Sequence, residues 1–417
     1  MRRFLVTALI LLALAFVVSP VYGNGNTERG PTVLTVLGVD DEYDKGMFDA
    51  YEAAHPGVQI KSLSIDRKDG TSVTIDALLA AGTPPDVYSG FIGRIAKLLT
   101  PKYAIPLDDH INPAEYYDFL LEACRIDGQQ LGMPHQFYAS GMNLNLDILD
   151  DAGFQVHDNW TMADWYTMCA VVQKETDKYP SGLFAVNPSG SYCLMAWFPV
   201  FGAELFRGGD YTRTTIDSPE GVRLFKFFDT MRIMGYLQPN VVTLKDVDFR
   251  TQWATGKIAA AAMPPSWHTA MFAAVKQGQI DKPFRNRFVW MPGGAAAGSP
   301  GMRGIVGHDS GDEAHNAVIV EFIQYMAGKH FQTAKVTAMP TMMPIRKDVS
   351  MDLLLEDTRR VLDYVAKVGI YDVGYKLPRY GEIRAALPFT LQGLFAGKLS
   401  PEEAAADYAK RITEALE

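Results

Sequence analysis

Apolar runs along the chain are short and are separated by polar segments that suit helices. Residues 32–39 (TVLTVLGV) are apolar and β-branched, which favours a buried strand. A helical segment that contains Phe48 and Tyr51 follows, and an HPG turn at residues 55–57 leads into a second strand-like run at 58–63. The order strand, helix, turn, strand predicts a βαβ unit with parallel pairing.

The stretch at residues 249–267 (FRTQWATGKIAAAAMPPSW) combines a helix end, a short strand and an aromatic residue. Gly256 suits the left-handed position that ends a helix. Small apolar residues at 258–263 fit a strand covered by helices on both faces, and the prolines at 264–265 end its ladder. In open α/β sheets, ligands bind outside the carboxyl ends of strands. We therefore expect Trp267 to face a ligand rather than to be a core aromatic.

This stretch resembles the signature of the family 1 extracellular solute-binding proteins, the maltodextrin-binding protein class of sugar-capturing ABC importer subunits. Residues 78–88 (LLAAGTPPDVY) match the family's Gly, Pro and Asp-Val motif, and residues 106–108 match its Pro-Leu-Asp turn. The resemblance spans essentially the whole mature chain. It implies a two-lobed α/β periplasmic-binding-protein fold, in which each lobe is a mostly parallel sheet flanked by helices and hinge crossovers join the lobes.

The length of 417 residues also exceeds what one hydrophobic core usually supports. By resemblance, residues 31–135 together with 300–340 form lobe one. Residues 136–299 together with 341–417 form lobe two. The first strand of lobe two is expected at residues 141–145.

The amino terminus has the pattern of a secretory signal peptide at residues 1–23: two arginines, an apolar run and a terminal small residue. The apolar run is shorter than the roughly 20 residues of a spanning helix, so we expect cleavage rather than anchoring. Residues 24–30 are expected to form a mobile polar leader. Since the first cysteine of the mature chain is Cys124, the lipid-bearing cysteine of lipoproteins is missing, and we expect a soluble periplasmic protein.

Charge and cysteine content exclude several classes of partner and cofactor. The net charge of −9 argues against nucleic acid and anionic membranes as partners. The three cysteines are widely spaced and match no disulfide framework or zinc pattern. Residues 308–315 (HDSGDEAH) are rich in metal-ligand types, but they directly precede an amphipathic helix, so helix capping is the preferred interpretation and an ion site the alternative. We expect no cofactor and no metal.

Ligand contacts are expected at strand ends, at the hinge and on an aromatic-rich helix at residues 191–209. A buried core position is an equal alternative for Tyr192 and Trp197. The candidates are Asp41, Glu42, Tyr43, Tyr88, Ser89, Gln136, Tyr138, Tyr192, Trp197, Trp267, Arg303 and Arg379.

The sequence therefore predicts a non-enzymatic, monomeric carrier that captures a mono- or oligosaccharide between its lobes and delivers it to the membrane permease of an ABC transporter. A polyol phosphate or a polyamine would suit the same fold. A secreted carbohydrate-active enzyme is the third possibility, but it needs a positioned carboxylate pair, and the sequence shows no such motif.

Overall fold

The computed structural model of the chain describes residues 30–38, 42–63, 71–137, 139–264, 269–295, 302–369, 371–377 and 379–417. The predicted signal peptide at residues 1–23 lies outside these ranges, as does the predicted leader apart from Gly30. Within the described ranges, no helix combines the length and apolar character needed to cross a bilayer.

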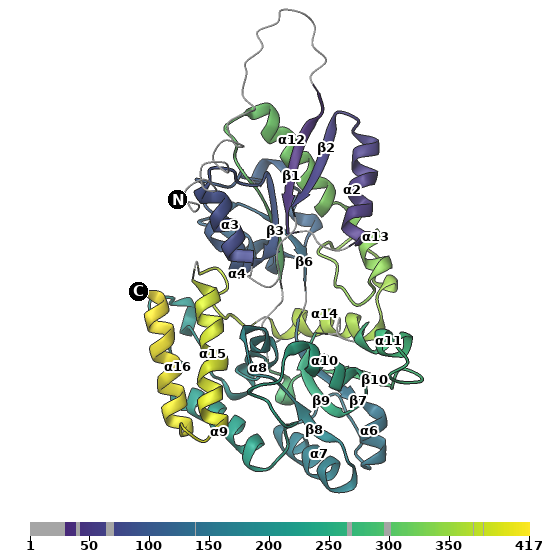
Figure 1. Ribbon diagram of the computed structural model, residues 1–417, viewed down its shortest axis with the longest axis vertical. Helices are drawn as coiled ribbons and strands as arrows, with labels where there is room; N and C mark the ends of the chain where they lie inside the picture. Colours follow the sequence, from purple (N-terminus) through teal and green to yellow (C-terminus); the bar gives the residue numbers. More distant parts are fainter. Residues whose placement is uncertain are drawn as a thin grey trace, which may run out of the picture.

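Two bodies lie one above the other in Figure 1, each built around its own sheet. The sheet of lobe one has the order β2-β1-β3-β11-β6 and that of lobe two the order β10-β7-β9-β8. In lobe one the strands are β1 Thr32–Leu37, β2 Val58–Leu63, β3 Val87–Phe91, β6 Met133–Gln136 and β11 Arg303–Gly307. In lobe two they are β7 Gly141–Asn145, β8 Tyr179–Gly182, β9 Ile258–Met263 and β10 Asn286–Val289. A small hairpin of β4 Arg125–Ile126 and β5 Gln129–Gln130 belongs to lobe one.

In each sheet, one of the described strands runs against the others. β11 is antiparallel to both β3 and β6, while β1 pairs in parallel with β2 and β3. In lobe two, β7 is antiparallel to β9 and β10, and β8 is parallel to β9. Both reversed strands come directly after a crossing between lobes. A chain that enters a lobe from its partner begins at the edge where the other strands end, so it must run the opposite way.

Helices cover both sheets. Those of lobe one are α2 Glu42–Ala54, α3 Thr71–Ala80, α4 Ile92–Ile95, α5 Asp118–Ala123, α12 Glu313–Ala327 and α13 Lys329–Ala338. Those of lobe two are α6 Leu146–Asp151, α7 Met162–Glu175, α8 Ser191–Met195, α9 Pro219–Ile233, α10 Asp246–Ala254, α11 Thr269–Lys276, α15 Tyr380–Phe395 and α16 Pro401–Leu416. Local sequence explains several helix starts: capping boxes formed by Thr161 with Asp164 and by Ser400 with Glu403 begin α7 and α16.

Each lobe has its own main hydrophobic core. In lobe one, side chains such as Leu34 and Ile305 of the sheet pack with Phe322 of α12. In lobe two, Trp165 of α7, Phe228 of α9 and Leu387 of α15 belong to a second cluster. Two separate cores confirm the predicted two-lobed α/β architecture, because each core buries the inner surfaces of its own elements.

The chain passes between lobes after β6, after β10 and by way of α14 (Glu356–Val368), which lies between the two bodies in Figure 1. Val361 of α14 is buried in the core of lobe one, whereas Asp357 accepts hydrogen bonds of 3.0 Å from the Asn286 side chain and from the Phe288 amide of β10. This helix therefore contacts both lobes.

The return to lobe two comes later than residue 341, where the sequence predicts it. Met342, Met343 and Ile345 are buried in the core of lobe one, and Met343 forms a β-bridge with Phe137. The proline-rich sequence of residues 339–346 indicates a turn. However, its apolar side chains face inward and complete lobe one before the chain reaches α14.

Candidate ligand-binding site

The carboxyl edge of the lobe one sheet is built from β1, β3 and β11. The parallel strands β1 and β3 end here, at Leu37 and Phe91, whereas the antiparallel β11 begins here at Arg303. The Nη2 group of Arg303 donates a hydrogen bond to the carbonyl oxygen of Gly38 and lies 3.5 Å from that of Ser89. The guanidinium group thus ties two strand ends together at the edge where α/β sheets bind ligands.

Arg303 also organises one face of this edge. It pairs with Phe91 on β3 and with Gln136 on β6, and the register with β6 shifts between Arg303 and Gly304. Such β-bulges re-aim side chains at sheet edges. The guanidinium carbon lies 5.7 Å from the centroid of the Phe91 ring, and Nε is buried without a hydrogen-bond partner in the described part of the chain. Two predicted residues, Arg303 and Gln136, therefore pair across neighbouring strands, and Phe91 pairs with Arg303 on its other side. Gln136 itself is buried, with 4% of its surface exposed.

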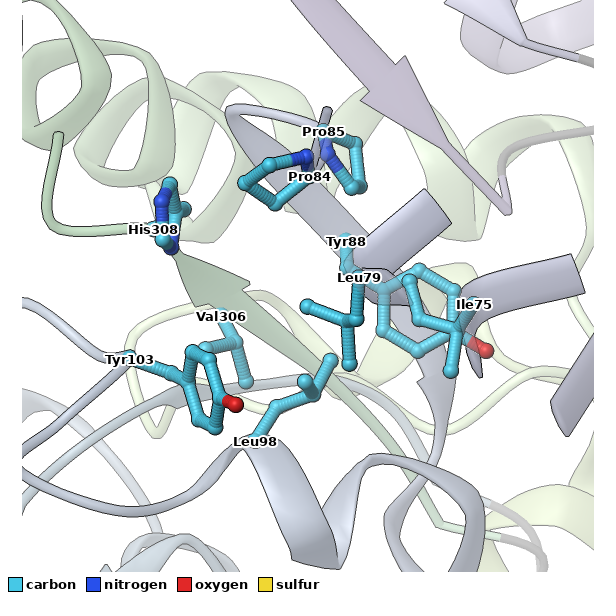
Figure 2. A pocket seen from close by; sticks show the side chains of 9 residues that line it. All are labelled: Ile75, Leu79, Pro84, Pro85, Tyr88, Leu98, Tyr103, Val306 and His308. Carbon is cyan, nitrogen blue, oxygen red and sulfur yellow. The ribbon is translucent and has the colours of Figure 1, made fainter. Parts of the chain in front are cut away.

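The sequence predicts Tyr88 and Ser89 as ligand contacts, but the structure buries both. Successive strand residues point to opposite faces of a sheet. Tyr88 is 2% exposed and faces α3, where its ring lines a small, largely apolar pocket with Ile75 and Leu79, as Figure 2 shows. Ser89 is fully buried, and its Oγ has no hydrogen-bond partner within the described ranges. Tyr88 is thus a core residue of lobe one, which corrects its predicted role.

The pocket in Figure 2 lies inside lobe one, between α3 and strands β3 and β11, rather than between the lobes. His308 lines one side of it and begins the acid-rich loop before α12. In that loop, Asp312 accepts hydrogen bonds from the amides of Ala314 and His315, and His315 Nε2 lies 2.7 Å from Asp86 Oδ1. Capping by Asp312 and the His315–Asp86 contact account for the polar residues of the loop. No metal-ligand group of three such side chains occurs among the described residues.

The corresponding edge of lobe two is formed by the ends of β8 and β9. These strands are parallel, so Gly182 and Met263 finish at the same edge. Asn143 on β7 fixes the end of β9, because its Nδ2 donates a hydrogen bond of 2.6 Å to the Met263 carbonyl oxygen. Trp267 follows four residues later and lies outside the described residues, so its exposure at this edge remains a prediction.

The segment that follows β8 is held by α15. Arg384 Nε donates to Ser191 Oγ at 2.6 Å, and its Nη2 donates to the Pro188 carbonyl oxygen at 2.9 Å. Gln392 Nε2 donates a hydrogen bond of 2.7 Å to the Ala185 carbonyl oxygen. No local sequence motif marks Arg384 or Gln392 as functional residues. Their partners lie about 200 residues away in the sequence, so local patterns could not reveal these contacts.

Trp197 is a core residue in the structure, which corrects its predicted ligand role. It is 2% exposed, and its ring centroid lies 4.8 Å from that of Trp165 and 4.4 Å from that of Phe227. The aromatic-rich segment around Trp197 therefore packs in the core of lobe two. Of the two interpretations that the sequence left open for Trp197, the structure supports the core.

The lobes touch where α15 begins. Tyr380, the first residue of α15, lies against Gly93 of α4, so close that a β-carbon at position 93 would overlap the ring. Lys376, just before α15, places its Nζ 3.0 Å from Glu122 Oε1 of lobe one. Since α4 directly follows β3, these contacts show that the carboxyl edge of the lobe one sheet faces lobe two.

The predicted contact Arg379 is exposed beside this junction. Its Nε and Nη2 donate to the two carboxylate oxygens of Glu382 at 2.9 Å and 2.7 Å. This bidentate bond lowers the pKa of Glu382. Arg379 therefore already has a carboxylate partner, unlike Arg303, which forms no ion pair within the described ranges.

The remaining predicted contacts are placed only in part. Asp41 and Tyr138 lie outside the described residues. Glu42 and Tyr43 open α2, directly after β1, and Tyr192 belongs to α8, but the placement of these three side chains is outside what the structure describes. Their roles remain predictions.

Comparison with known proteins gives a consistent result. The sequence profile described as bacterial extracellular solute-binding protein matches residues 38–332, which is more than half of the 417 residues. An arabinooligosaccharide-binding protein of Halalkalibacterium halodurans is 23% identical over 261 residues. That match covers 60% of this chain and 56% of the relative, so the chain spans little more than half the length of this relative.

Solved structures share the fold over nearly the whole chain. The GacH receptor of Streptomyces glaucescens, crystallised unliganded and with acarbose, has a TM-score of 0.76 at 17% identity and covers 93% of this chain and 99% of its own. A solute-binding protein of Thermotoga lettingae bound to α-D-tagatose has a TM-score of 0.76 at 18% identity, covering 93% of this chain and all of its own. These similarities confirm the predicted two-lobed fold.

Proposed function

The chain belongs to the bacterial extracellular solute-binding proteins, and from this we propose that it captures a mono- or oligosaccharide between its lobes for a membrane permease of the ABC class. One observation carries the proposal: the Tyr380–Gly93 contact turns the carboxyl edge of the lobe one sheet towards lobe two. Ligands of open α/β sheets bind at that edge. A relative named as an arabinooligosaccharide-binding protein, and similar structures solved with acarbose and with α-D-tagatose, support a sugar as the ligand.

Each lobe contributes a different kind of contact in this proposal. Lobe one supplies the guanidinium of Arg303, which donates hydrogen bonds to hydroxyl oxygens, with Phe91 and Gln136 beside it. Lobe two supplies Trp267, whose indole stacks on the apolar C–H face of a sugar ring. The proposed further contacts are Asp41, Glu42, Tyr43, Tyr138, Tyr192 and Arg379.

Closure of the lobes makes these contacts effective. Each net hydrogen bond is worth about 1 kcal/mol, so several must form together with stacking. A ligand that binds both walls shifts the equilibrium towards the closed arrangement. The elements that adjust are the crossings after β6 and β10 and the helix α14. We propose that the closed form of this exported, monomeric and non-catalytic protein is what its permease recognises.

Native mass spectrometry of freshly purified mature protein (residues 24–417) tests for a retained ligand. Calorimetry then compares arabinotriose, maltotriose, D-tagatose, glycerol 3-phosphate and spermidine. We expect binding of at least one of the neutral sugars. Binding of only the phosphate or the polyamine would replace the sugar in this proposal. Turnover of a chromogenic glycoside that one carboxylate substitution abolishes would replace the binding role by an enzymatic one.

A further inference from the structure

One face of α15 links the contact between the lobes to the segment that follows β8. Tyr380 and Arg384 are four residues apart in α15, so they share one side of the helix, and Gln392 lies eight residues beyond Arg384. Tyr380 lies against Gly93 of lobe one at the start of α15. Arg384 and Gln392 bind the segment after β8 within lobe two. In Figure 1 α15 runs beside α16 from the junction of the lobes into lobe two.

The buried guanidinium group of Arg384 binds one backbone carbonyl oxygen and one hydroxyl group of the segment after β8. The residue is 8% exposed. Its Nε donates to Ser191 Oγ at 2.6 Å and its Nη2 to the Pro188 carbonyl oxygen at 2.9 Å, while Ser191 Oγ itself lies 2.7 Å from that carbonyl. Burying a guanidinium costs several kcal/mol unless its hydrogen bonds compensate. A buried apolar side chain would avoid that cost, but it could not fix the segment at these two points.

The held segment emerges at the edge of lobe two that faces the ligand in the proposed function. β8 and β9 are parallel, so the residues after Gly182 and those after Met263 leave the sheet on the same side. The segment continues through the 3-10 turn Pro188–Gly190 into α8, which carries the predicted contact Tyr192. Gln392 secures its start, through the Ala185 carbonyl oxygen at 2.7 Å.

We propose that Arg384 is a positioning residue for ligand binding: it fixes residues 187–192 at the ligand-facing edge of lobe two. Because Tyr380 lies one turn earlier on the same face and touches lobe one, α15 couples the position of this segment to closure of the lobes. This inference rests on the proposed function for its ligand, but the ordering of residues 187–192 by Arg384 is independent of it.

The test uses the mature full-length chain with R384M, R384K and a control in the same helix. T390V is the control, because Thr390 is fully buried in α15 but donates to Asp407 of α16 at 2.6 Å, away from the segment. Calorimetry uses arabinotriose, or maltotriose or D-tagatose if one of these binds the wild-type chain more tightly. Hydrogen–deuterium exchange follows the amides of residues 183–195 without ligand.

R384M is expected to weaken binding about ten- to hundredfold, since hydrogen bonds from a charged group are lost. R384K should recover part of this loss because its ammonium reaches one of the two acceptors. T390V should lower the melting temperature yet leave the affinity within about twofold, as expected for an independent site. Exchange of residues 187–192 should accelerate about tenfold in R384M and remain unchanged in T390V.

Wild-type affinity and wild-type exchange in R384M would overturn the inference. An equal loss of affinity in T390V would also overturn it, because the effect would then be general destabilisation. If the wild-type chain binds none of the three sugars, the proposed function fails in the form tested. The exchange measurement alone then decides whether Arg384 orders the segment.

Discussion

Tyr380 of lobe two and Gly93 of lobe one lie so close together that a β-carbon at position 93 would overlap the tyrosine ring. Gly93 sits in α4, immediately beyond the end of β3, and Tyr380 begins α15. The absence of a side chain at one residue therefore sets how closely the two lobes approach beside the candidate site.

Replacing Gly93 by alanine should weaken ligand binding by about tenfold. Overpacking at a close contact costs about 1–3 kcal/mol, and about 1.4 kcal/mol corresponds to a tenfold change in affinity. We expect this cost to fall on the liganded arrangement, in which the lobes lie closest together, so that it appears as a loss of affinity. Calorimetry with the best-binding sugar measures the change.

Gly381 provides the matched control, because it lies next to Tyr380 and a β-carbon there would meet no atom within 4 Å. G381A should bind as the wild-type chain does. A G93A variant with unchanged affinity would mean that this contact does not form in the liganded state.

Arg303→Met should reduce sugar affinity about ten- to hundredfold, because hydrogen bonds from a charged donor are worth about 1.5–3 kcal/mol. Arg303 is held at the strand ends by the Gly38 carbonyl oxygen. Because its charge has no carboxylate partner within the described ranges, the guanidinium group is available to a ligand. Calorimetry and thermal denaturation should be measured on the same preparation, to separate affinity from stability.

Arg379→Met is the comparison for Arg303. Both carboxylate oxygens of Glu382 already accept hydrogen bonds from Arg379, so its guanidinium is less available to a ligand. A smaller loss of affinity is expected. If R379M weakened binding more than R303M, Arg379 rather than Arg303 would be the main cationic contact.

Local patterns predicted elements well where the cause of the structure is local. The stretch at 249–267 contains the end of α10, a left-handed Gly256 with φ of 67° and the strand β9. The strand β7 at residues 141–145 was expected from the family resemblance rather than from a local pattern. The capping box of Thr161 with Asp164 was also readable, because both partners lie within one turn. The helix end at Gly256 and the cap at Thr161 depend on residues close in sequence, whereas the pairing of β7 with β9 joins residues far apart in the chain.

Side-chain direction and long-range contacts were not readable in the same way. Tyr88 and Ser89 follow one another in β3, yet one faces α3 and the other the opposite side of the sheet. The face that each side chain takes depends on the pairing of β3 with β1, about 50 residues earlier, and with β11, more than 200 residues later. The Arg384–Ser191 bond and the Tyr380–Gly93 contact also depend on tertiary packing, which composition and periodicity do not encode.

The two tryptophans that the sequence offered as sugar contacts should respond differently to replacement by alanine. Trp197 is 2% exposed in the core of lobe two, so W197A should destabilise the chain by about 3–5 kcal/mol. W267A should instead lower the affinity about tenfold. Stacking of the indole on a sugar ring, with the desolvation that accompanies it, contributes on the order of 1–2 kcal/mol. Thermal denaturation and calorimetry distinguish the two outcomes.

Wild-type affinity in W267A would remove the stacking platform from the proposed site. A large loss of stability in that variant would show that Trp267 is a core aromatic, which is the alternative that its residue type suggests. W197A should be assayed for binding well below its melting temperature, where the folded fraction is still high.

Asp86 should make the stability of lobe one depend on pH. Its carboxylate accepts hydrogen bonds from the Thr35 amide at 2.6 Å and from Thr35 Oγ1 at 2.7 Å, and His315 Nε2 lies 2.7 Å away. Burial acts to raise the pKa of Asp86, but the bonds from Thr35 and His315 outweigh it, and the pKa is lowered. The folded chain therefore binds this proton less readily than the unfolded chain does.

A lowered pKa in the folded state stabilises the chain at pH values above the unfolded pKa of about 3.9, and the contribution is lost as the pH falls through the folded value. D86N should thus be less stable than the wild-type chain at pH 7, by about 1–3 kcal/mol, because donors of Thr35 lose their charged acceptor. The difference in the free energy of unfolding between D86N and the wild-type chain, measured by urea unfolding, should shrink between pH 5 and pH 3, over about the range where carboxylates titrate.

Asp352, whose side chain is 95% exposed, supplies the control, and D352N should follow the wild-type curve. A D86N penalty that stayed constant down to pH 3 would show that the Thr35–Asp86–His315 contact stabilises the fold through packing rather than through the carboxylate charge.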